Sequence, residues 1–425
     1  MELSLFIVTL LGGMAIGIPI ALALLVSGVF LMMYMDIFAT EIIAQNLING
    51  ANNFSLMAIP FFMLAGELMN AGGISKRIID LAMTLVGHIR GGLGYAAILA
   101  SILFAGLSGS AVADTAALGA ILIPMMVKSG YRRDRSTGLI ATGGIIATTI
   151  PPSVPLIVFG VVGSVSITKL FMGGIVPGLM IGIALAITWW FSTRKDDYEV
   201  YPRKSIKEML QAARHAIWAI FLPVIIVVGL RGGIFTPTEA SVVAAAYAWF
   251  VGAVIYRELD MKALYQSLVE SAKTASVVMF LVAAALVSSW MITTANIPSY
   301  ITGLLEPFMS SPTLLMLAII LLVLLIGMVM DLTPTVLILT PVLMPIIKVA
   351  GIDPVYFGIV FILTCSIGML TPPVGLVLNV AAGVGKLSME KTVKGMLPFL
   401  IAELIVLIIL ILFPSVILVP LGWLS

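Results

Sequence analysis

Long apolar stretches, separated by short polar connections, follow one another along almost the whole chain. The clearest runs are Leu5–Met33, Leu170–Phe191, Ile217–Leu230 and Leu397–Phe413. A helix needs about 20 mostly apolar residues to cross the hydrocarbon core of a bilayer. The pattern therefore predicts an all-α protein that crosses a membrane many times. The first run follows Met1 and Glu2 directly and has no small-residue cleavage site after it, so we expect a span there rather than a signal peptide.

The amino-acid composition agrees with this pattern. Of 425 residues, 61% are hydrophobic and 10% are charged, against about 25% charged in an ordinary globular domain, and the mean hydropathy is +1.20. The formal net charge of +2 gives no sign of a nucleic-acid partner. One cysteine (Cys365) and two histidines (His88 and His215) exclude a disulfide framework and argue against a metal site built from protein ligands alone. We expect no bound cofactor.

Two segments, Pro124–Pro177 and Pro345–Pro398, repeat one arrangement of prolines and glycines. Six pairs of identical residues lie at a constant offset of 221 positions, as Pro372 does from Pro151. The pairs are Pro124/Pro345, Gly130/Gly351, Pro151/Pro372, Pro152/Pro373, Gly174/Gly395 and Pro177/Pro398. Duplicated halves whose hydrophobic segments are interrupted at equivalent positions are typical of secondary transporters, in which the substrate site lies where the interruptions meet.

Each half also contains two short apolar arms joined by a tip of small and polar residues. The arms and tips, in chain order, are Gly92–Leu107, Ser108–Ser110 and Ala111–Val127, then Leu314–Val329, Asp331–Pro334 and Val336–Ile347. An arm of about 15 residues is about 23 Å long, too short for a full crossing. A polar tip at that depth is tolerated only inside the protein or beside a cavity. We therefore predict two re-entrant helical hairpins, at residues 91–127 and 312–348, each followed by a helix broken at a Pro-Pro pair, at residues 136–162 and 354–385.

The lysines and arginines indicate that the two halves have opposite orientations. Basic residues follow the first hairpin but hardly the second, and follow the second broken helix but hardly the first. The first hairpin is followed by Lys128, Arg132, Arg133 and Arg135, whereas the second is followed by Lys348. The second broken helix is followed by Lys386, Lys391 and Lys394, whereas the first is followed by Lys169. Because positively charged connections stay cytoplasmic, equivalent points of the halves lie on opposite sides of the membrane. We therefore predict inverted repeats.

The chain then divides into three parts. They are repeat 1 (residues 1–193), a cytoplasmic linker with one connecting span (194–232) and repeat 2 (233–425). Inversion requires an odd number of crossings between equivalent points of the repeats, and the connecting span supplies it. The prediction is then about nine full crossings, with the N-terminus inside and the C-terminus outside. Pro19 interrupts the first run and leaves a different local arrangement open there. The polar segments Glu41–Asn52 and Lys262–Lys273 are predicted to be interfacial helices, with ordinary connecting loops as the alternative.

The two Pro-Pro breaks, Pro151-Pro152 and Pro372-Pro373, form the candidate functional site together with the hairpin tips. Proline has no N–H and disrupts the helix around it, so carbonyl groups that would accept intrahelical hydrogen bonds become free. Free carbonyls and nearby hydroxyls suit a small alkali cation, and the N-terminus of the half-helix that follows suits an anion. The alternative is a pair of proline kinks that serve packing alone.

Asp114 and Asp331 are the notable carboxylates in these segments. An ionisable group at membrane depth is a functional candidate by default, and the two could attract a coupling cation or relay protons. The alternative is that each braces its hairpin through hydrogen bonds, because neither has a basic partner in its own hairpin. Asn379, after the second break, is a candidate for substrate contact or for a helix–helix hydrogen bond. Glu239 completes a capping box with Thr236, and we expect no direct role for it.

Five stretches of sequence resemble the large membrane subunit (the M, or DctM-type, subunit) of the tripartite ATP-independent periplasmic (TRAP) transporters. They are Leu107–Ala117, Ile150–Ser153, Gly233–Ala240, Gly327–Pro334 and Leu370–Val374. The resemblance covers essentially the whole chain. It is closest to the diketogulonate-type large permease, while sialate and C4-dicarboxylate permeases share much of the pattern.

The resemblance implies a sodium-driven importer of a small organic acid anion (a sugar acid, sialate or C4-dicarboxylate) in a bacterial inner membrane. It also implies an elevator mechanism and two partners, a small membrane subunit of about four helices and a periplasmic substrate-binding protein. Sodium is then expected at Ser108, Ser110, Ala147, Ile150, Pro152, Gly327, Gly368, Thr371 and Val374. Of these, Ala147 and Ile150 are the equivalents of Gly368 and Thr371, and they can contribute backbone atoms only. Substrate is expected at Ser153, Thr333 and Asn379.

Three other classes of protein stay open. A proton-coupled organic anion transporter would use Asp114 and Asp331. An uncoupled channel can also contain inverted repeats, although two closed hairpin tips suit alternating access better. An intramembrane serine protease is suggested by the Gly-Leu-Ser-Gly stretch around Ser108, but a serine nucleophile needs a base within reach, and His88 and His215 lie in or beside charged loops.

Overall fold

The structure is a computed structural model that describes residues 2–194, 202–309 and 311–424. Within these ranges the chain forms helices and no β-strand. The first half contains α1 (Glu2–Ala15), α2 (Ile20–Tyr34), α3 (Thr40–Ala51), η1 (Phe54–Met57), α4 (Ala58–Ala71), α5 (Ile74–Val86), α6 (Gly92–Ser108), α7 (Ala111–Lys128), α8 (Arg133–Gly144), η2 (Ile145–Thr148), α9 (Val154–Val162) and α10 (Ile167–Thr193). The second half contains α11 (Ile206–Arg231), α12 (Pro237–Phe250), η3 (Val251–Ile255), α13 (Met261–Thr294), α14 (Ile297–Leu305), η4 (Glu306–Phe308), α15 (Pro312–Gly327), α16 (Leu332–Val349), α17 (Pro354–Gly368), α18 (Leu376–Gly385), α19 (Met389–Leu412) and α20 (Ser415–Leu424).

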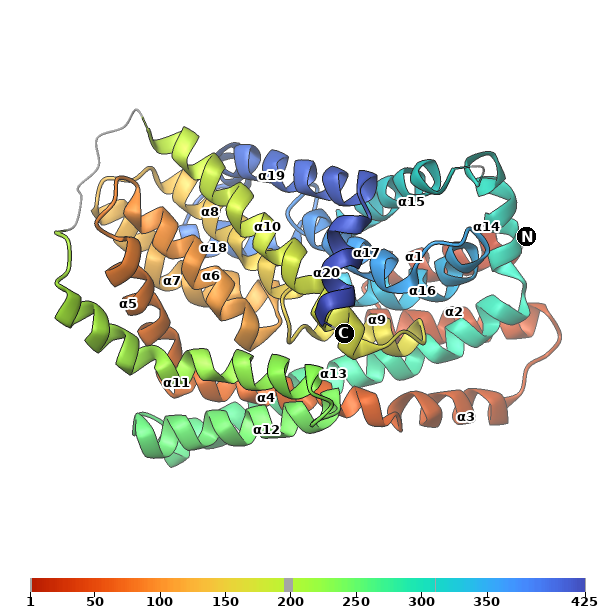
Figure 1. Ribbon diagram of the computed structural model, residues 1–425. Helices are drawn as coiled ribbons and strands as arrows, with labels where there is room; N and C mark the ends of the chain where they lie inside the picture. The colour runs from red at the N-terminus through yellow and green to blue at the C-terminus, as the bar shows by residue number, and fades with distance from the viewer. Residues whose placement is uncertain (1, 195–201, 310, 425) are drawn as a thin grey trace.

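Two sets of helices repeat the same order, and the sets are inverted relative to each other. At the offset of 221, α5 to α10 correspond to α14 to α19, so that Ser110 and Asp331 stand at the same place before α7 and α16. In Figure 1, α5, α6 and α7 lie at the left of the molecule and α14, α15 and α16 at the right. The two hairpins therefore approach the centre from opposite ends. This arrangement confirms the predicted inverted repeats.

Both predicted hairpins are present. In the first, α6 and α7 are joined by Gly109 and Ser110, and Gly109 has a φ of +63°, a left-handed conformation that favours glycine at this tight turn. In the second, Gly327 ends α15 and Leu332 begins α16. The predicted tip at Asp331–Pro334 was therefore placed too late in the sequence. The carboxylate of Asp331 accepts the N–H of Leu332 and so starts the helix at once.

Both helices that contain a Pro-Pro pair are broken as predicted. The first consists of α8 with η2 and then α9, and the second of α17 and then α18. The Pro151-Pro152 and Pro372-Pro373 peptide bonds are cis in both breaks. The half-helices after the breaks turn their N-termini toward the centre of the molecule, where the hairpin tips also lie (Figure 1).

The first apolar run forms two short helices instead of the predicted single crossing. Gly17 has a φ of +86°, the N–H of Ile18 donates to the carbonyl of Gly13, and Pro19 follows, which is a helix C-terminus of the Schellman type. The chain turns back there, and α2 packs against α1. One of the about nine predicted crossings is thus replaced by a helical pair.

This change also reverses the predicted side of the N-terminus. In Figure 1 the start of α1 lies at the right, whereas the end of α10 and the start of α11, which carry basic residues, lie at the left. If the basic end is cytoplasmic, the N-terminus lies on the other side of the membrane. The prediction of an inside N-terminus was wrong because it counted one crossing where the chain makes two short passes.

The second predicted interfacial helix is also corrected. Lys262–Lys273 is the first part of α13, one continuous helix of 34 residues. At 1.5 Å per residue such a helix is about 51 Å long, well beyond the roughly 30 Å of a bilayer core, so its polar start extends past the membrane. The equivalent segment in the first half is divided into α3 and α4 at Asn53, which caps η1, and both helices pack along α13. The short amphipathic helices of the repeats are instead α5 and α14, one before each hairpin.

Eight helices among the described residues are long and apolar enough to cross a membrane, two of them being the hairpin arms α7 and α16. The protein is therefore a multi-pass membrane protein.

The hairpins and broken helices pack together as one group, since α7 contacts α8 and α18, and α8 contacts α19. We call α6–α10 and α15–α19 the hairpin unit. The helices α4, α11, α12 and α13 lie along its lower side in Figure 1.

Candidate functional site

A cavity of about 300 Å³ lies where both hairpin tips and both breaks meet. Its lining comes from the hairpin unit on one side and from α4 and α13 on the other. The lining residues are Met63, Ser108, Gly109, Ser110, Ala111, Val112, Thr148, Val154, Pro155, Thr274, Val278, Asp331, Leu332, Thr333, Met369 and Leu376. Among these described residues no lysine, arginine or histidine occurs, and Asp331 is the one charged side chain.

Four helix N-termini converge on this cavity, because the first residues of α7, α9, α16 and α18 all line it. Their N-caps are Ser110, Ser153, Asp331 and Gly375. The N-terminus of a helix carries unpaired N–H groups and the positive end of the helix dipole, equivalent to about half an elementary charge. Such ends favour an anion by means of the backbone, without a basic side chain, and Asp331, which caps α16, is the one negative charge beside them.

The first hairpin tip is held by a small network around Asp114. The hydroxyl of Ser108 donates to one carboxylate oxygen of Asp114, and the N–H of Ser110 donates to the Ser108 hydroxyl (3.1 Å). Asp114 is buried, and its second oxygen has no hydrogen-bond partner among the described residues. The hydroxyls of Thr115, the next residue on α7, and of Thr149 in the first break are likewise buried without a partner among the described residues. Asp114 thus braces the tip, and its second carboxylate oxygen is left for another ligand.

The first break packs directly against the first tip. A β-carbon at Gly109 would lie 2.6 Å from the carbonyl oxygen of Pro152, so the backbones of tip and break are in contact. The hydroxyl of Ser153 donates to the carbonyl of Thr148 (2.6 Å) and accepts the N–H of Leu156 (3.4 Å). Ser153 therefore closes the break and caps α9, and its side chain is fully buried.

The second break is joined to the second tip by backbone hydrogen bonds. The N–H groups of Val374 and Gly375 both donate to the carbonyl of Met328, at 3.2 and 3.3 Å. Gly327 and Gly368 pack backbone to backbone, since a β-carbon on Gly368 would lie 2.7 Å from Gly327. Each break is thus fixed to the hairpin tip of its own repeat.

The two breaks also contact each other. The hydroxyls of Thr148 and Ser366 lie 2.7 Å apart, both buried, and this hydrogen bond connects segments 218 residues apart in sequence. Ligands held at either break would therefore be coupled through one hydrogen-bonded core.

The residues expected at the site divide into those that line the cavity and those that do not. Ser108, Ser110, Asp331 and Thr333 line the cavity. The other expected sodium contacts do not line the cavity, and lie in the breaks or where a tip packs against a break. They are Ala147, Ile150, Pro152, Gly327, Gly368, Thr371 and Val374. The Thr371 hydroxyl donates to the carbonyl of Ile367 (2.9 Å), and the exposed amide of Asn379 donates to the carbonyl of Val374 (2.5 Å). Their contacts with sodium or substrate stay predictions.

Sequence reasoning missed the wall of the cavity that α4 and α13 supply. Met63, Thr274 and Val278 belong to it. A single hydroxyl such as that of Thr274 inside a long helix gives no signal in the sequence, and only the packing of α13 on the hairpin unit reveals it.

Glu403 of α19 was also missed, although a carboxylate in a long apolar run is visible in the sequence. It is fully buried, and neither carboxylate oxygen has a partner among the described residues.

The remaining candidates have structural explanations. Glu239 accepts the N–H of Thr236 (2.8 Å), and its own N–H donates to the Thr236 hydroxyl (3.3 Å), which confirms the capping box. His88 and His215 line two other cavities, so the described surroundings of Ser108 contain no histidine base. Within the described ranges, no three His, Cys, Asp or Glu side chains gather as a metal site.

Comparison with known proteins agrees with this architecture. Residues 5–416 match the family described as the DctM component of the tripartite ATP-independent periplasmic transporters. The chain is 54% identical over its full length, and over the full length of the relative, to the 2,3-diketo-L-gulonate TRAP transporter large permease of Escherichia coli. It is 38% identical to the sialic acid large permease of Vibrio cholerae, with 95% of each chain covered. It is 39% identical to the C4-dicarboxylate large permease of Pseudomonas aeruginosa, with 90% of each chain covered.

A solved structure shares the fold at low sequence identity. The YdaH transporter of Alcanivorax borkumensis, described as having an unusual topology, aligns with a TM-score of 0.62 at 15% identity, covering 88% of this chain and 87% of that one. The match supports the arrangement of the helices alone. The family match over nearly the whole sequence and the relative of 54% identity show that the chain belongs to the DctM family of large TRAP transporter permeases.

Proposed function

We propose that this large permease imports a small organic acid anion by sodium symport. The observation that carries the proposal is the cavity of about 300 Å³ on which four helix N-termini converge. That volume is at the lower end of the range for small-molecule sites. An anionic ligand there would be held by backbone N–H groups and by the hydroxyls of Ser110, Thr148 and Thr333, which suits carboxylates with several hydroxyl groups.

Among organic anions, a sugar acid is the substrate class that we favour. The relative named for 2,3-diketo-L-gulonate is 54% identical to this chain, whereas the sialic acid and C4-dicarboxylate permeases are 38% and 39% identical. The cavity has apolar residues beside its hydroxyls, which agrees with a ligand that has one charged end.

Sodium coupling is supported by the oxygen atoms around the two breaks. Asp114 has a buried carboxylate oxygen without a partner near the first tip, and the hydroxyls of Thr115 on α7 and of Thr149 in the first break are also buried without partners among the described residues. Sodium binds hard oxygen ligands, and a carboxylate among them offsets the cost of burying the ion. The proton-coupled alternative would use the same free oxygen of Asp114, so experiment has to separate the two.

An elevator movement is supported by the division of the cavity wall. One side belongs to the hairpin unit, in which tips and breaks are hydrogen-bonded to one another, and the other side to α4 and α13. A unit that moves as one body along α4 and α13 would carry substrate and ions together. The amphipathic helices α5 and α14 precede the two hairpins and would connect the moving and fixed parts.

We further propose that the protein works in a bacterial inner membrane with a small membrane subunit and a periplasmic substrate-binding protein. The family description names a tripartite system, and this chain corresponds to one component of it. The absence of basic side chains among the described lining residues favours delivery of substrate by a binding protein over capture from dilute solution.

Uptake into proteoliposomes tests this function. The purified permease, with the small subunit and the binding protein of the same system, is reconstituted and supplied with radiolabelled 2,3-diketogulonate. We expect uptake that follows an inward sodium gradient, is lost when potassium replaces sodium, and needs the binding protein. Uptake driven by a proton gradient without sodium would instead support the alternative, and the variant Asp114→Asn would then abolish coupling.

A further inference from the structure

A second cavity lies between the hairpin unit and α11, on the far side of the first break from the proposed substrate site. Its volume is about 390 Å³. It is lined by α5, α6, α10 and α11 and by Ile150 and Pro151 of the break, and every described residue that lines it is apolar. Gly106 of α6 makes the direct contact across this seam, because a β-carbon there would lie 2.9 Å from the ring of Pro223 on α11.

The rim of this cavity faces outward along the membrane-crossing part of the molecule. Leu179 on α10 and Val224 and Val228 on α11 line it and are 42%, 46% and 57% exposed. In a bilayer, side chains exposed at this depth meet lipid tails. An apolar chain can therefore enter the cavity from the hydrocarbon core.

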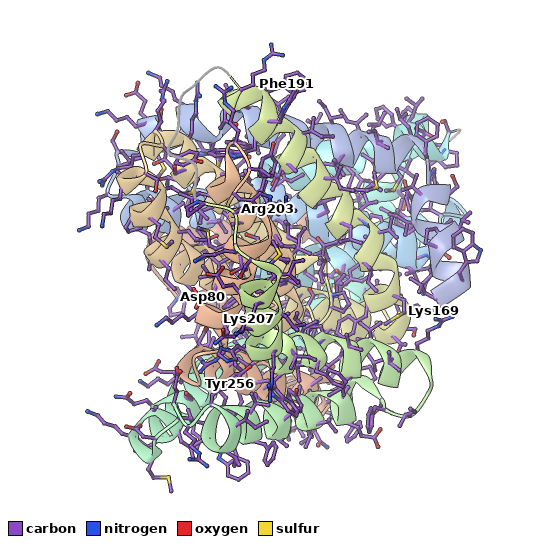
Figure 2. All side chains as sticks on the ribbon, turned by 60° about the vertical axis from the view of Figure 1, so that its left-hand side comes forward. Asp80, Lys169, Phe191, Arg203, Lys207 and Tyr256 are labelled. Carbon is purple, nitrogen blue, oxygen red and sulfur yellow. The ribbon has the colours of Figure 1, made fainter. Side chains whose placement is uncertain are left out.

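A polar pocket of about 220 Å³ lies next to this cavity along α5 and α11. Arg77, Asp80, Glu208 and His215 line it. Arg77 is adjacent to Ile78 of the apolar cavity, and His215 is one turn before Ala219 of that cavity. Figure 2 shows Asp80 and Lys207 facing the viewer at this end of the molecule, with Tyr256 below them. The polar and the apolar pocket are thus neighbours along α5 and α11, with basic and acidic side chains together in the polar one.

The guanidinium of Arg77 is held in a fixed position. It donates to Glu258 (2.8 Å) and to the carbonyl of Gly73 (2.8 Å), and it stacks on the ring of Tyr256 at 3.7 Å. Tyr256 in turn donates its hydroxyl hydrogen to the carbonyl of His215 (2.6 Å). A guanidinium has five N–H donors, so some stay available to a phosphate. The carboxylate of Asp80 is on an exposed position of α5 in the same pocket and can accept an ammonium group.

We propose that these two pockets bind one membrane phospholipid with a zwitterionic, amine-bearing headgroup of the phosphatidylethanolamine type. The phosphate lies against Arg77, the ammonium group against Asp80, and one acyl chain enters the apolar cavity beside Pro151. Lipid tails are as apolar as leucine, so filling the cavity brings packing but little hydrophobic gain. Selectivity between lipids therefore comes from the mixed charge of the polar pocket, which matches a zwitterion better than an anionic headgroup.

This lipid fills the seam between the hairpin unit and α11, so it sits where the proposed elevator movement has to occur. A fluid acyl chain can keep the seam filled while the two sides slide, which a rigid protein helix cannot do. The effect on transport rate rests on the proposed elevator function, whereas the binding of the lipid does not. The two claims are separated by measuring lipid binding and uptake independently.

Native mass spectrometry of the permease with its small subunit, released from mixed vesicles of phosphatidylethanolamine and phosphatidylglycerol, tests the site. We expect wild-type protein to retain phosphatidylethanolamine preferentially. Val224→Trp, which fills the rim of the cavity, reduces its retention roughly tenfold. Ile183→Trp, at a position of α10 that is 60% exposed and outside the cavity, leaves retention unchanged. Asp80→Lys removes the preference for phosphatidylethanolamine over phosphatidylglycerol.

Equal retention in the Val224→Trp and Ile183→Trp proteins would overturn the proposal, as would equal binding of both lipids by the wild type. Efficient cross-linking of Val224→Cys to the small subunit in native membranes would also overturn it, because the partner would then occupy the cavity. Loss of lipid in Val224→Trp together with slower uptake in phosphatidylethanolamine vesicles supports the role in the seam. Loss of lipid with unchanged uptake overturns that role and leaves the binding site standing.

Discussion

The two hairpins occupy equivalent places in the repeats, but their bases are held very differently. At the base of the first, Trp189 of α10 donates its indole N–H to the carbonyl of Gly91 (2.8 Å), and a β-carbon on Gly94 would overlap the indole ring. The indole also stacks between Tyr131 and Phe399, with ring centroids 5.8 and 6.2 Å away. The aromatic residue locks the hairpin onto α10 and α19.

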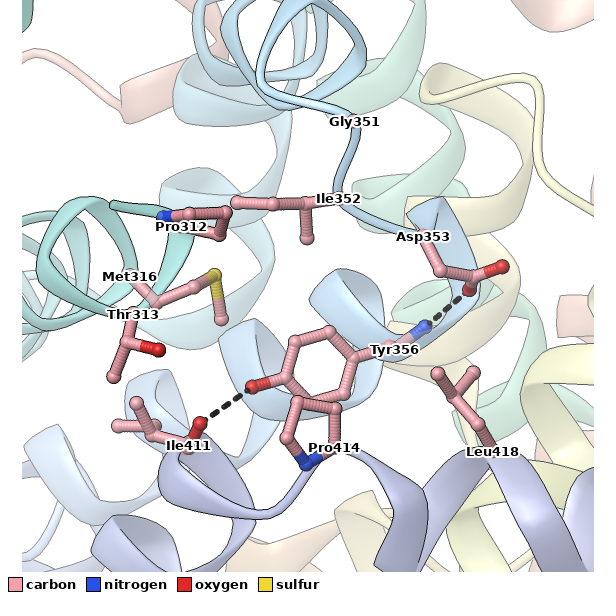
Figure 3. A pocket seen from close by; sticks show the side chains of 10 residues that line it. All are labelled: Pro312, Thr313, Met316, Gly351, Ile352, Asp353, Tyr356, Ile411, Pro414 and Leu418. Carbon is pink, nitrogen blue, oxygen red and sulfur yellow. Dashed lines mark hydrogen bonds between the residues drawn. The ribbon is translucent and has the colours of Figure 1, made fainter. Parts of the chain in front are cut away.

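The base of the second hairpin contains a cavity of about 240 Å³ instead (Figure 3). The position equivalent to Trp189 is Leu410, and that of Tyr131 is Ile352, which lines the cavity. Figure 3 shows Tyr356 in the middle of this cavity, with its hydroxyl donating to the carbonyl of Ile411 (3.3 Å). No described indole fills the space. The comparison teaches that the two inverted copies need not be packed alike at the hairpin base, and it predicts that the second hairpin moves more easily than the first.

The largest expected effect comes from removing the lock of the first hairpin. Trp189→Ala leaves a cavity and removes the indole hydrogen bond to the Gly91 carbonyl, which keeps the N–H of Gly94 (2.9 Å), and we expect the free energy of unfolding to fall by about 3–5 kcal/mol. Denaturant unfolding in detergent measures it, with Trp190→Ala as the control, since Trp190 is 51% exposed. A loss no larger than that of the control would show that the first hairpin is not held by the indole.

A side chain at the second break is expected to have the next largest effect. Gly368→Val forces atoms into the backbone of Gly327, which costs about 1–3 kcal/mol of stability and separates the second tip from its break. We expect uptake to fall with little change in membrane insertion. Gly383→Val, where a β-carbon meets nothing within 4 Å, serves as the control. The equivalent position in the first repeat is Ala147, which already has a methyl group. If the Gly368→Val protein had wild-type uptake, the second break would tolerate a side chain as the first one does, and the predicted difference between the breaks would be wrong.

Filling the cavity at the second base should make the two hairpins more alike. Leu418→Phe adds volume beside Tyr356 and is expected to stabilise the protein by about 0.5–2 kcal/mol. Hydrogen exchange of α15 should slow, and uptake should slow with it, because the second hairpin is then held more firmly. Val419→Phe, on the neighbouring position that is 47% exposed and outside the cavity, is the control. Faster exchange of α15 in the Leu418→Phe protein would contradict the comparison.

The smallest effect concerns the two tips. Asp331→Asn keeps a side chain that caps a helix well, so stability should change by no more than about 0.5 kcal/mol, whereas Asp331→Ala loses about 1 kcal/mol. Sodium dependence of uptake should be the same in wild type and Asp331→Asn, since Ser110 at the equivalent position of the first tip is uncharged. An altered coupling ratio would show that Asp331 acts in coupling, and that the tips differ in function as well as in sequence.

The elements that could be predicted from sequence are those that leave a local chemical signal. Paired prolines at an offset of 221 located both breaks, and short arms with polar tips located both hairpins. The lysine and arginine pattern gave the inversion. A different arrangement at Pro19 was left open, but the turn at Gly17 was not predicted, because the flanking runs are uniformly apolar and have no period that separates one long helix from two short ones.

Tertiary contacts explain what could not be predicted. Thr274 enters the cavity wall only because α13 packs along the hairpin unit, and the hydrogen bond between Thr148 and Ser366 joins residues that have no mutual signal in the sequence. The start of α13 was assigned to a separate surface helix because its residues are polar. The helix continues there because no proline or glycine interrupts Lys262–Lys273.

The central claim is that sodium and an organic anion are held by the two tips and breaks. It is tested most directly by the thermal unfolding midpoint of the permease with its small subunit, in sodium and in potassium at matched ionic strength. A ligand that binds only the folded state adds about 2.7 kcal/mol at a hundredfold excess over its dissociation constant. We predict a sodium-specific rise in the midpoint that disappears when Ser108 and Thr371 are replaced by bulky residues. An equal midpoint in both salts for folded protein, or a rise that survives both replacements, would contradict the account.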